Sequence, residues 1–197
     1  MKTRVINLTA HEARAFQRGA TMLVRECKPQ PVYRSDVFDE LKLTHNGWWW
    51  IRPDGTGIHS ARTADECMQQ LAESPYFYPY QPGDLLIGRE AWMPLWDSGS
   101  GFYTCLPPTG RANDPDICKF RTDGGRPTNF DASWQPASRM PAELARVRRI
   151  VSAVSLKRCQ ELTEADIEAM KYDFCEHNAR LWAENRFVWV TNLREET

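Results

Sequence analysis

Six cysteines and four histidines are among the side chains of this chain that could hold a metal ion or act as nucleophiles. The cysteines form no C-x-x-C pair, and their spacing fits no zinc module. Nothing in the sequence pairs a histidine with a nucleophile. We therefore expect reduced cysteines, several of them buried as small apolar groups, with a Cys105–Cys118 metal or redox pair as the alternative. The sequence predicts no metal site and no cofactor.

The stretch RGATMLVRECKPQP, residues 18–31, is a candidate for the rim of a site, either a working one or one that has lost its chemistry. It begins like a basic loop that leaves a helix, and Pro29 and Pro31 end the strand that follows. Ala20 stands where a reactive side chain could be needed. The eight tryptophans are many for this length. A tryptophan usually fills a core or an interface but can also stack on a base, and Trp92 is the best candidate for that second role.

Composition limits the classes of partner. The chain has 197 residues, 42% of them hydrophobic, which suits one globular domain. Its net charge of −1 gives no global field toward nucleic acid or membrane, so any phosphate binding must come from a local basic patch. No apolar run approaches the roughly 18 residues of a membrane span, and the N-terminus lacks the apolar core of a signal peptide. We expect a cytoplasmic protein with no membrane partner.

Hydrophobic periodicity predicts the elements that would position a site. RVINL reads as a strand, and the helix after it would begin with a capping box of Thr9 and Glu12 and end near Gly19. Further strands are predicted at TMLVREC, from Leu85 to Trp92, at RVRRIVSAVSLKRCQ and at FVWVTNL. In the third of these, a bulge is expected where two adjacent arginines, residues 148 and 149, break the alternation.

Two stretches read as β-rich insertions. In residues 36–60, Asn46-Gly47 is a hairpin signal, and a short helix with a capping box of Thr63 and Glu66 should follow. Residues 97–133 are rich in Gly, Pro, Asp and Ser and contain two short possible strands, GFYTCL and DICKFRT.

LTEADIEAMKYDFCEHNARLWAE is the strongest helix pattern in the chain. An acidic capping pair should begin it, and one apolar face would carry Ile167, Met170, Phe174 and Leu181. Many short strands with two principal helices predict an α+β fold, a small β-barrel that the helices plug or flank.

Five stretches occur in the same order as the motifs of a known family. They are RGATMLVRECKPQP, PGDLLIGREAW, RMPAELARVRRIV, CQELTEADI and NRFVWVTNL. They are similar to GRKTQTRR with VVKPQP, PGDRLWVRETW, HMPRWASRITLEV, LQDISEADA and NPWVWVIEF. In these motifs the chain resembles phage- and prophage-associated ASCH domains, a branch of the PUA-like β-barrels. The resemblance implies a single domain over residues 1–197, with insertions at about 33–75 and 97–130 that it does not cover.

The resemblance also implies a cleft in which related domains bind RNA or modified bases. Some small ASCH proteins hydrolyse the amide of N4-acetylcytidine, with a Lys and a Thr of GRKTxT and a Glu early in the last helix. Those positions are Ala20, Leu23 and Met170 here, and a shift of one residue gives Thr21 and Val24 instead. Neither register restores the lysine. Because amide hydrolysis needs a nucleophile or base and an oxyanion stabiliser, we expect no catalytic residue.

Polar groups remain at the rim of the implied cleft. Arg25 matches the last Arg of the motif, Glu90 matches the Glu of VRETW, and Arg139 replaces a His. A glutamate can accept from a cytosine amino group, and an arginine can pair with a phosphate or stack on a base. Arg25 and Glu90 could instead form a salt bridge, and Trp92, expected on the same strand face as Glu90, could simply pack. The predicted ligand-binding residues are Thr21, Arg25, Lys28, Glu90, Trp92 and Arg139.

We therefore expect a non-catalytic ASCH-like binding domain that holds RNA, a nucleotide or a modified base in its cleft. One alternative is a protein-interaction factor in phage assembly or counter-defence, whose insertions would contact a host or phage protein. The other is an amidohydrolase or ribonuclease, for which Thr21, Glu26, Lys28 and Glu90 are the available parts.

Overall fold

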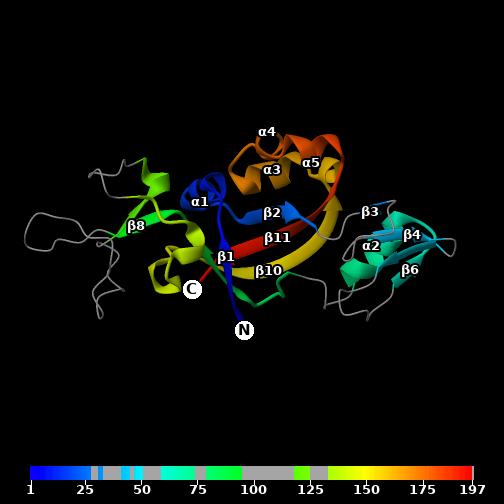
Figure 1. The fold of residues 1–197 in the computed structure, drawn as a ribbon, viewed down its shortest axis with the longest axis horizontal. Coiled ribbons are helices and arrows are strands. Elements are labelled where there is room, and N and C mark those ends of the chain that lie inside the picture. Colours follow the sequence, from blue (N-terminus) through cyan, green and yellow to red (C-terminus); the bar gives the residue numbers. More distant parts are fainter. Residues whose placement is uncertain are drawn as a thin grey trace, which may run out of the picture.

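The computed structural model describes residues 1–27, 31–32, 41–44, 47–50, 59–73, 79–94, 118–124 and 133–196. It is a mixed α/β protein whose main sheet has five strands in the order β1-β7-β10-β11-β2 (Figure 1). These strands are β1 (Thr3–Asn7), β7 (Leu85–Arg89), β10 (Val147–Arg158), β11 (Phe187–Glu195) and β2 (Met22–Glu26). β1 and β7 run parallel, and the other neighbours run antiparallel.

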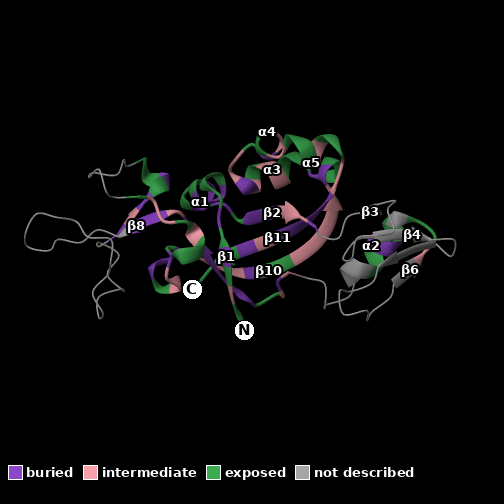
Figure 2. Cartoon of the chain, in the orientation of Figure 1, coloured by how far each residue is buried: buried purple, intermediate pink, exposed green. Residues whose placement is uncertain are grey.

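The core lies on both sides of β2, because successive side chains of a strand point to opposite faces. Leu23 packs with Phe16 beneath helix α1 (Ala10–Gln17). Val24 packs with Met170 and Phe174, which belong to the helical segment near the C-terminus. Figure 2 shows the resulting buried stretches in the main sheet. The pocket described below opens on the Val24 side.

Two smaller sheets lie at opposite ends of the main sheet (Figure 1). At one end, β3 (Pro31–Val32), β4 (Leu41–Thr44), β5 (Gly47–Trp50) and β6 (His59–Ala61) form a four-stranded sheet beside α2 (Ala64–Glu73). Cys67 and Met68 of α2 are buried against Cys27 and Trp189, which joins this region to the main sheet. At the other end, β8 (Trp92–Pro94) pairs with β9 (Cys118–Phe120).

The inserted hairpin is confirmed, because Thr44 of β4 pairs with Gly47 of β5. Its loop, residues 45–46, lies outside the described residues, as does the predicted strand GFYTCL. The strand predicted in DICKFRT is confirmed as β9. The capping boxes that begin α1 and α2 are also confirmed.

The predicted small barrel is not confirmed, because no sheet formed by the described residues closes on itself. β1 and β2 are the edge strands of the main sheet. A side chain connects them, since Nη2 of Arg25 in β2 donates to the carbonyl oxygen of Asn7 in β1 at 2.8 Å. A single side-chain bridge of this kind brings the two edges together without a backbone ladder.

The single long helix predicted near the C-terminus is wrong. The segment forms three short helices, α3 (Glu164–Met170), α4 (Phe174–His177) and α5 (Ala179–Ala183). Lys171 adopts the left-handed conformation with φ of 59°, and the side chain of Asp173 begins α4 by accepting from the N–H of Glu176. The predicted apolar face survives the break, because Met170 and Phe174 are buried in one cluster against which Ile167 and Leu181 pack. The predicted capping box of Thr163 and Asp166 is present.

The strand predicted from Leu85 to Trp92 is also interrupted. β7 ends at Arg89, and Trp92 begins β8, which belongs to another sheet. Glu90 and Trp92 therefore do not share a strand face, contrary to the prediction. The bulge in β10 lies between Val151 and Ala153 and not at the adjacent arginines. Short 3-10 turns complete the described elements: η2 (Arg121–Asp123), η3 (Ala137–Arg139), η4 (Ala142–Leu144) and η5 (Cys159–Glu161).

The PGD motif has a clear structural role at the start of β7. The buried carboxylate of Asp84 accepts the backbone N–H groups of Lys2 and Gln81 and the Nε–H of Arg4. Burial alone would raise the pKa of Asp84, but these hydrogen bonds outweigh it and lower the pKa below its ordinary value. The motif thus joins the beginnings of β1 and β7.

Four of the five cysteines in the described part of the chain are buried, which confirms the prediction for several of them. Burial raises the pKa of Cys27 to about 12 and that of Cys67 and Cys159 to about 11, so these thiols are poor nucleophiles. Cys105, the proposed partner of Cys118, lies outside the described residues. None of the helices that the structure describes has both the length and the apolar surface to cross a membrane.

Candidate ligand-binding pocket

A pocket of about 360 Å³ opens between the start of α1, strand β2 and the helical segment near the C-terminus. Its volume lies in the range of small-ligand sites. Polar groups, imidazole rings and apolar side chains all contribute to its wall. The lining residues are Asn7, Thr9, His11, Glu12, Val24, Arg25, Glu26, Tyr172, His177, Asn178 and Leu181.

A forked ion pair between Glu12 and Arg25 forms one side of the pocket. Nε and Nη2 of Arg25 donate to the two carboxylate oxygens of Glu12 at 3.0 and 2.9 Å. The same carboxylate accepts the backbone N–H of Thr9 at 2.7 Å as half of the capping box. Glu12 is only 6% exposed, so its charge needs these three donors. The start of α1 and strand β2 are thereby held in one arrangement at the pocket.

Three rings stand together in the wall of the same pocket. The rings of His11 and His177 stack with centroids 3.5 Å apart, and Tyr172 lies over His177 at 5.9 Å. His11 belongs to the first turn of α1, His177 ends α4, and Tyr172 lies in the break between α3 and α4. The break in the predicted helix is therefore what brings Tyr172 to the pocket.

The proton affinities of these rings are shifted by their surroundings. Burial, and after it the nearby His177 and Arg14, lowers the pKa of His11 below 6.5, so its ring is neutral at pH 7. Burial raises the pKa of Tyr172 above 10, and the charge of Glu12 acts in the same direction. The pocket thus presents an uncharged imidazole and an uncharged phenol.

The charged groups that line the pocket are paired within the protein. Glu12 is neutralised by Arg25, and Glu26 accepts from Nη1 of Arg186 at 2.7 Å. Val24 and Leu181 add apolar wall. This combination suits an uncharged, flat, partly polar ligand better than an isolated anion, because none of the described lining residues is a cation without a carboxylate partner other than the two histidines.

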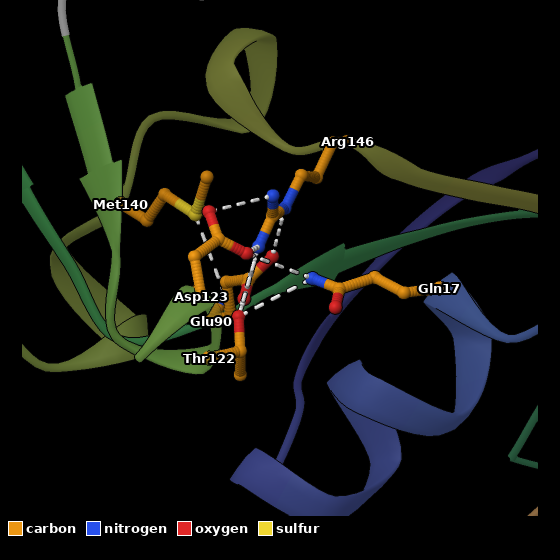
Figure 3. A network of polar contacts seen from close by, with 6 residues as sticks. All are labelled: Gln17, Glu90, Thr122, Asp123, Met140 and Arg146. Carbon is orange, nitrogen blue, oxygen red and sulfur yellow. Dashed lines mark hydrogen bonds and ion pairs between the residues drawn. The ribbon is translucent and has the colours of Figure 1, made fainter. Parts of the chain in front are cut away.

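Glu90 lies in a separate, filled network (Figure 3). It is 1% exposed, and Nε and Nη2 of Arg146 donate to its two carboxylate oxygens at 2.8 and 3.2 Å. The hydroxyl of Thr122 also donates to Glu90, and Asp123 accepts from Arg146 at 2.7 and 3.0 Å. The guanidinium group of Arg146 lies 3.8 Å from the ring centroid of Phe120. The predicted alternative of an Arg25–Glu90 salt bridge is wrong, because each residue has a different partner.

Trp92 packs rather than opening onto the pocket. It is 5% exposed and belongs to a cluster with Phe120, Met140 and Leu144. Its Nε1 is buried without a hydrogen-bond partner. Of the two roles considered for Trp92, its position therefore fits packing in the core and not stacking on a base.

The remaining predicted site residues are dispersed. Thr21 is exposed just before β2, and its backbone bonds to Ala169 and Leu193. Arg139 is exposed in η3, and its Nη1 donates to Gln135 at 3.4 Å. Lys28 lies outside the described residues. The structure therefore places only Arg25 of the predicted set at this pocket.

The positions of the family's reactive groups are apolar and buried. Ala20, Leu23 and Met170 are each at most 1% exposed and belong to the core. If the GRKTxT motif is aligned one residue later, its threonine falls on Val24, which lines the pocket beside Arg25. In either register the side chain offers no nucleophile.

Sequence reasoning missed Glu12, His11, Tyr172 and His177 as pocket residues. Glu12 was identified, but only as a helix cap, because nothing local shows that the same carboxylate also holds Arg25. The two histidines come from opposite ends of the chain and carry no local signal.

The described residues contain no group of three or more His, Cys, Asp and Glu side chains that could hold a metal ion. Comparison with known proteins gives no further constraint. No family model matches the chain, and neither the curated proteins nor the solved structures contain a match. Membership of the ASCH family therefore stays a prediction that rests on the five ordered motifs.

Proposed function

We propose that this protein is a non-catalytic, PUA-like binding domain of the ASCH type that holds a nucleotide, a modified base or a segment of RNA. The observation that carries the proposal is the pocket formed by the Glu12–Arg25 pair and the His11–His177–Tyr172 rings. In this proposal the main sheet corresponds to an open PUA-like barrel, in which the side chain of Arg25 connects the edge strands β1 and β2.

The chemistry of the pocket supports a base as the bound group. A flat heterocycle can stack on imidazole and phenol rings, and its polar edge can meet the amide of Asn178 and the carboxylate of Glu12. Nη1 of Arg25 donates no hydrogen bond within the described part of the chain, so it remains as a donor for such an edge. In this proposal Arg25 is the predicted residue that contacts ligand, whereas Glu90 and Trp92 support the fold.

The residues of the pocket do not favour hydrolysis. Thr21 and Glu90, two of the parts considered for an enzyme, lie elsewhere, and Glu26 is paired with Arg186. The carboxylate of Glu12 accepts three hydrogen bonds from within the protein, so its oxygens are already engaged. Binding without turnover is the activity that this arrangement supports.

Isothermal titration with cytidine, N4-acetylcytidine and a short single-stranded RNA at low salt tests the proposal. We expect binding of at least one of them, and roughly a tenfold loss of affinity in His177→Ala, which removes a stacking ring from an exposed position. Arg180→Ala on α5, also exposed but outside the pocket, is the matched control and should bind like the wild type.

Absence of binding by all three ligands would overturn the proposal. Chromatography of the same mixtures shows whether N4-acetylcytidine loses its acetyl group or RNA is cleaved. Turnover that is lost in Glu12→Gln would replace the binding domain with an enzyme.

A further inference from the structure

One face of α1 carries a stripe of one imidazole and two arginines that begins at the pocket. His11, Arg14 and Arg18 are spaced by three and four residues, which places them within about 60° on one side of the helix. All three are exposed. His11 lines the pocket, and the charge of Arg14 contributes, after burial and His177, to lowering the pKa of His11. The stripe therefore leads away from the pocket along α1 for about 10 Å.

The two arginines of this stripe are available for a ligand. Within the described residues, neither guanidinium group contacts a carboxylate. Most pocket-side cations are not available in this way, because Arg25 and Arg186 are held by Glu12 and Glu26. Unpaired arginines beside a pocket that suits an uncharged ring are complementary to a chain of linked bases and phosphates.

A second hollow lies at the far end of the stripe. It measures about 510 Å³ and is lined by Arg18, Ile167, Glu168, Lys171, Tyr172, Asp173 and Cys175. Tyr172 lines both this hollow and the pocket, so the two are adjacent. Glu168 pairs with Lys171, and Asp173 accepts the backbone N–H of Glu176 but has no cation partner among the described residues. Arg18 is the cation of the hollow that no described carboxylate contacts.

We propose that the ligand is a single-stranded nucleic acid longer than one nucleoside, with one base in the pocket, its phosphates on Arg14 and Arg18, and the next unit in the second hollow. This inference rests on the proposed function and narrows its ligand from a free nucleoside to a strand. Tyr172 separates the two units in the way that an aromatic ring separates successive bases on a single-strand platform.

A length series at low salt tests the proposal by isothermal titration. The ligands are cytidine and RNA oligonucleotides of two, four and eight residues. The wild type should bind the four-residue strand roughly tenfold tighter than cytidine, because phosphate contacts add to the base contact. The double variant Arg14→Gln/Arg18→Gln should lose that gain and keep its affinity for cytidine.

A charge-matched control separates these contacts from a general loss of positive charge. Arg62→Gln/Arg194→Gln removes two exposed arginines whose guanidinium groups, among the described residues, contact no carboxylate and line neither hollow. It should bind the strand like the wild type. The slope of the logarithm of the binding constant against the logarithm of the salt concentration should become shallower by about 1.4 in Arg14→Gln/Arg18→Gln but not in the control, because each of two lost phosphate contacts contributes about 0.7.

Each outcome decides between the two proposals. Equal affinity for cytidine and for the strands, or an unchanged double variant, overturns the strand inference and leaves the pocket proposal standing. Absence of any binding overturns both. Poly-glutamate is the competing ligand. If it binds as tightly as RNA and Arg14→Gln/Arg18→Gln abolishes that binding, the stripe is a docking surface for an acidic protein, and the strand inference fails.

Discussion

Two arginine–glutamate pairs of this protein have nearly the same local geometry and different surroundings. In both, Nε and Nη2 of an arginine meet the two oxygens of a buried carboxylate, and the arginine side chains are 33% and 32% exposed for Arg25 and Arg146. Around Arg146 the space is filled by Thr122, Asp123 and the ring of Phe120, as Figure 3 shows in part. Around Arg25 the space is a pocket.

The difference shows that residue type and pair geometry do not by themselves mark a binding site. Each of the three guanidinium nitrogens of Arg146 donates to a protein group, so none of them is without a protein partner. Arg25 keeps one nitrogen without a partner in the described part of the chain and faces open volume. The first pair is a structural clamp, and the second can be both a clamp and a contact for ligand.

The largest expected effect breaks the clamp. Arg146→Met should lower the free energy of unfolding by about 3–5 kcal/mol, because it leaves the carboxylate of Glu90 buried and uncompensated. Urea denaturation followed by tryptophan fluorescence measures the change. The double variant Arg146→Met/Glu90→Gln should recover part of the loss, since it removes the buried charge as well. If the double variant were no more stable than Arg146→Met, the buried charge of Glu90 would not be the cause of the loss, and the description of this pair as a structural clamp would be wrong.

A smaller loss is expected at the pocket pair. Arg25→Met removes two hydrogen bonds to Glu12 and the bridge to Asn7, and should cost about 2 kcal/mol, since the open pocket lets water reach the carboxylate. Arg25→Lys keeps the charge but not the fork, and should cost about 1 kcal/mol. The same denaturation assay ranks the two variants. A loss at Arg25 as large as that at Arg146 would contradict the comparison.

A dependence on pH should follow from His11. The folded protein holds the pKa of this ring below 6.5, mainly through burial, so the unfolded chain binds the proton more tightly. The stabilisation is fully present above pH 6.5 and is lost as the pH falls through the lowered pKa. The free energy of unfolding, measured between pH 7.5 and 5.5, should fall less steeply in His11→Asn than in the wild type. Parallel curves would show that the stacked histidines carry no such linkage.

The smallest effect on stability is expected at the ring that separates the two hollows. Tyr172→Phe keeps the packing and removes a hydroxyl for which the described residues offer no partner, so stability should change by no more than about 0.5 kcal/mol. Titration with the ligand that binds best should show whether the hydroxyl is part of the site. A loss of more than about 1 kcal/mol in stability would place this residue with the structural clamps.

Local signals predicted much of the secondary structure. The capping boxes of Thr9 with Glu12 and of Thr163 with Asp166 are formed by side chains three residues apart, so the sequence contains everything they need. The apolar and β-branched residues of β2, β10 and β11 likewise predicted strands in these places. The break after Met170 was not predictable, because Lys171 is not a residue that marks the left-handed conformation.

What the sequence by itself determined is most of the strands, the capping boxes and the apolar faces. Those properties depend on residues that are close along the chain. Only the tertiary structure decided that Glu12 meets Arg25, that Glu90 meets Arg146, and that one of these pairs opens onto a pocket while the other is enclosed. An arginine can reach any carboxylate within the length of its side chain, so the folded arrangement of distant strands and turns selects its partner.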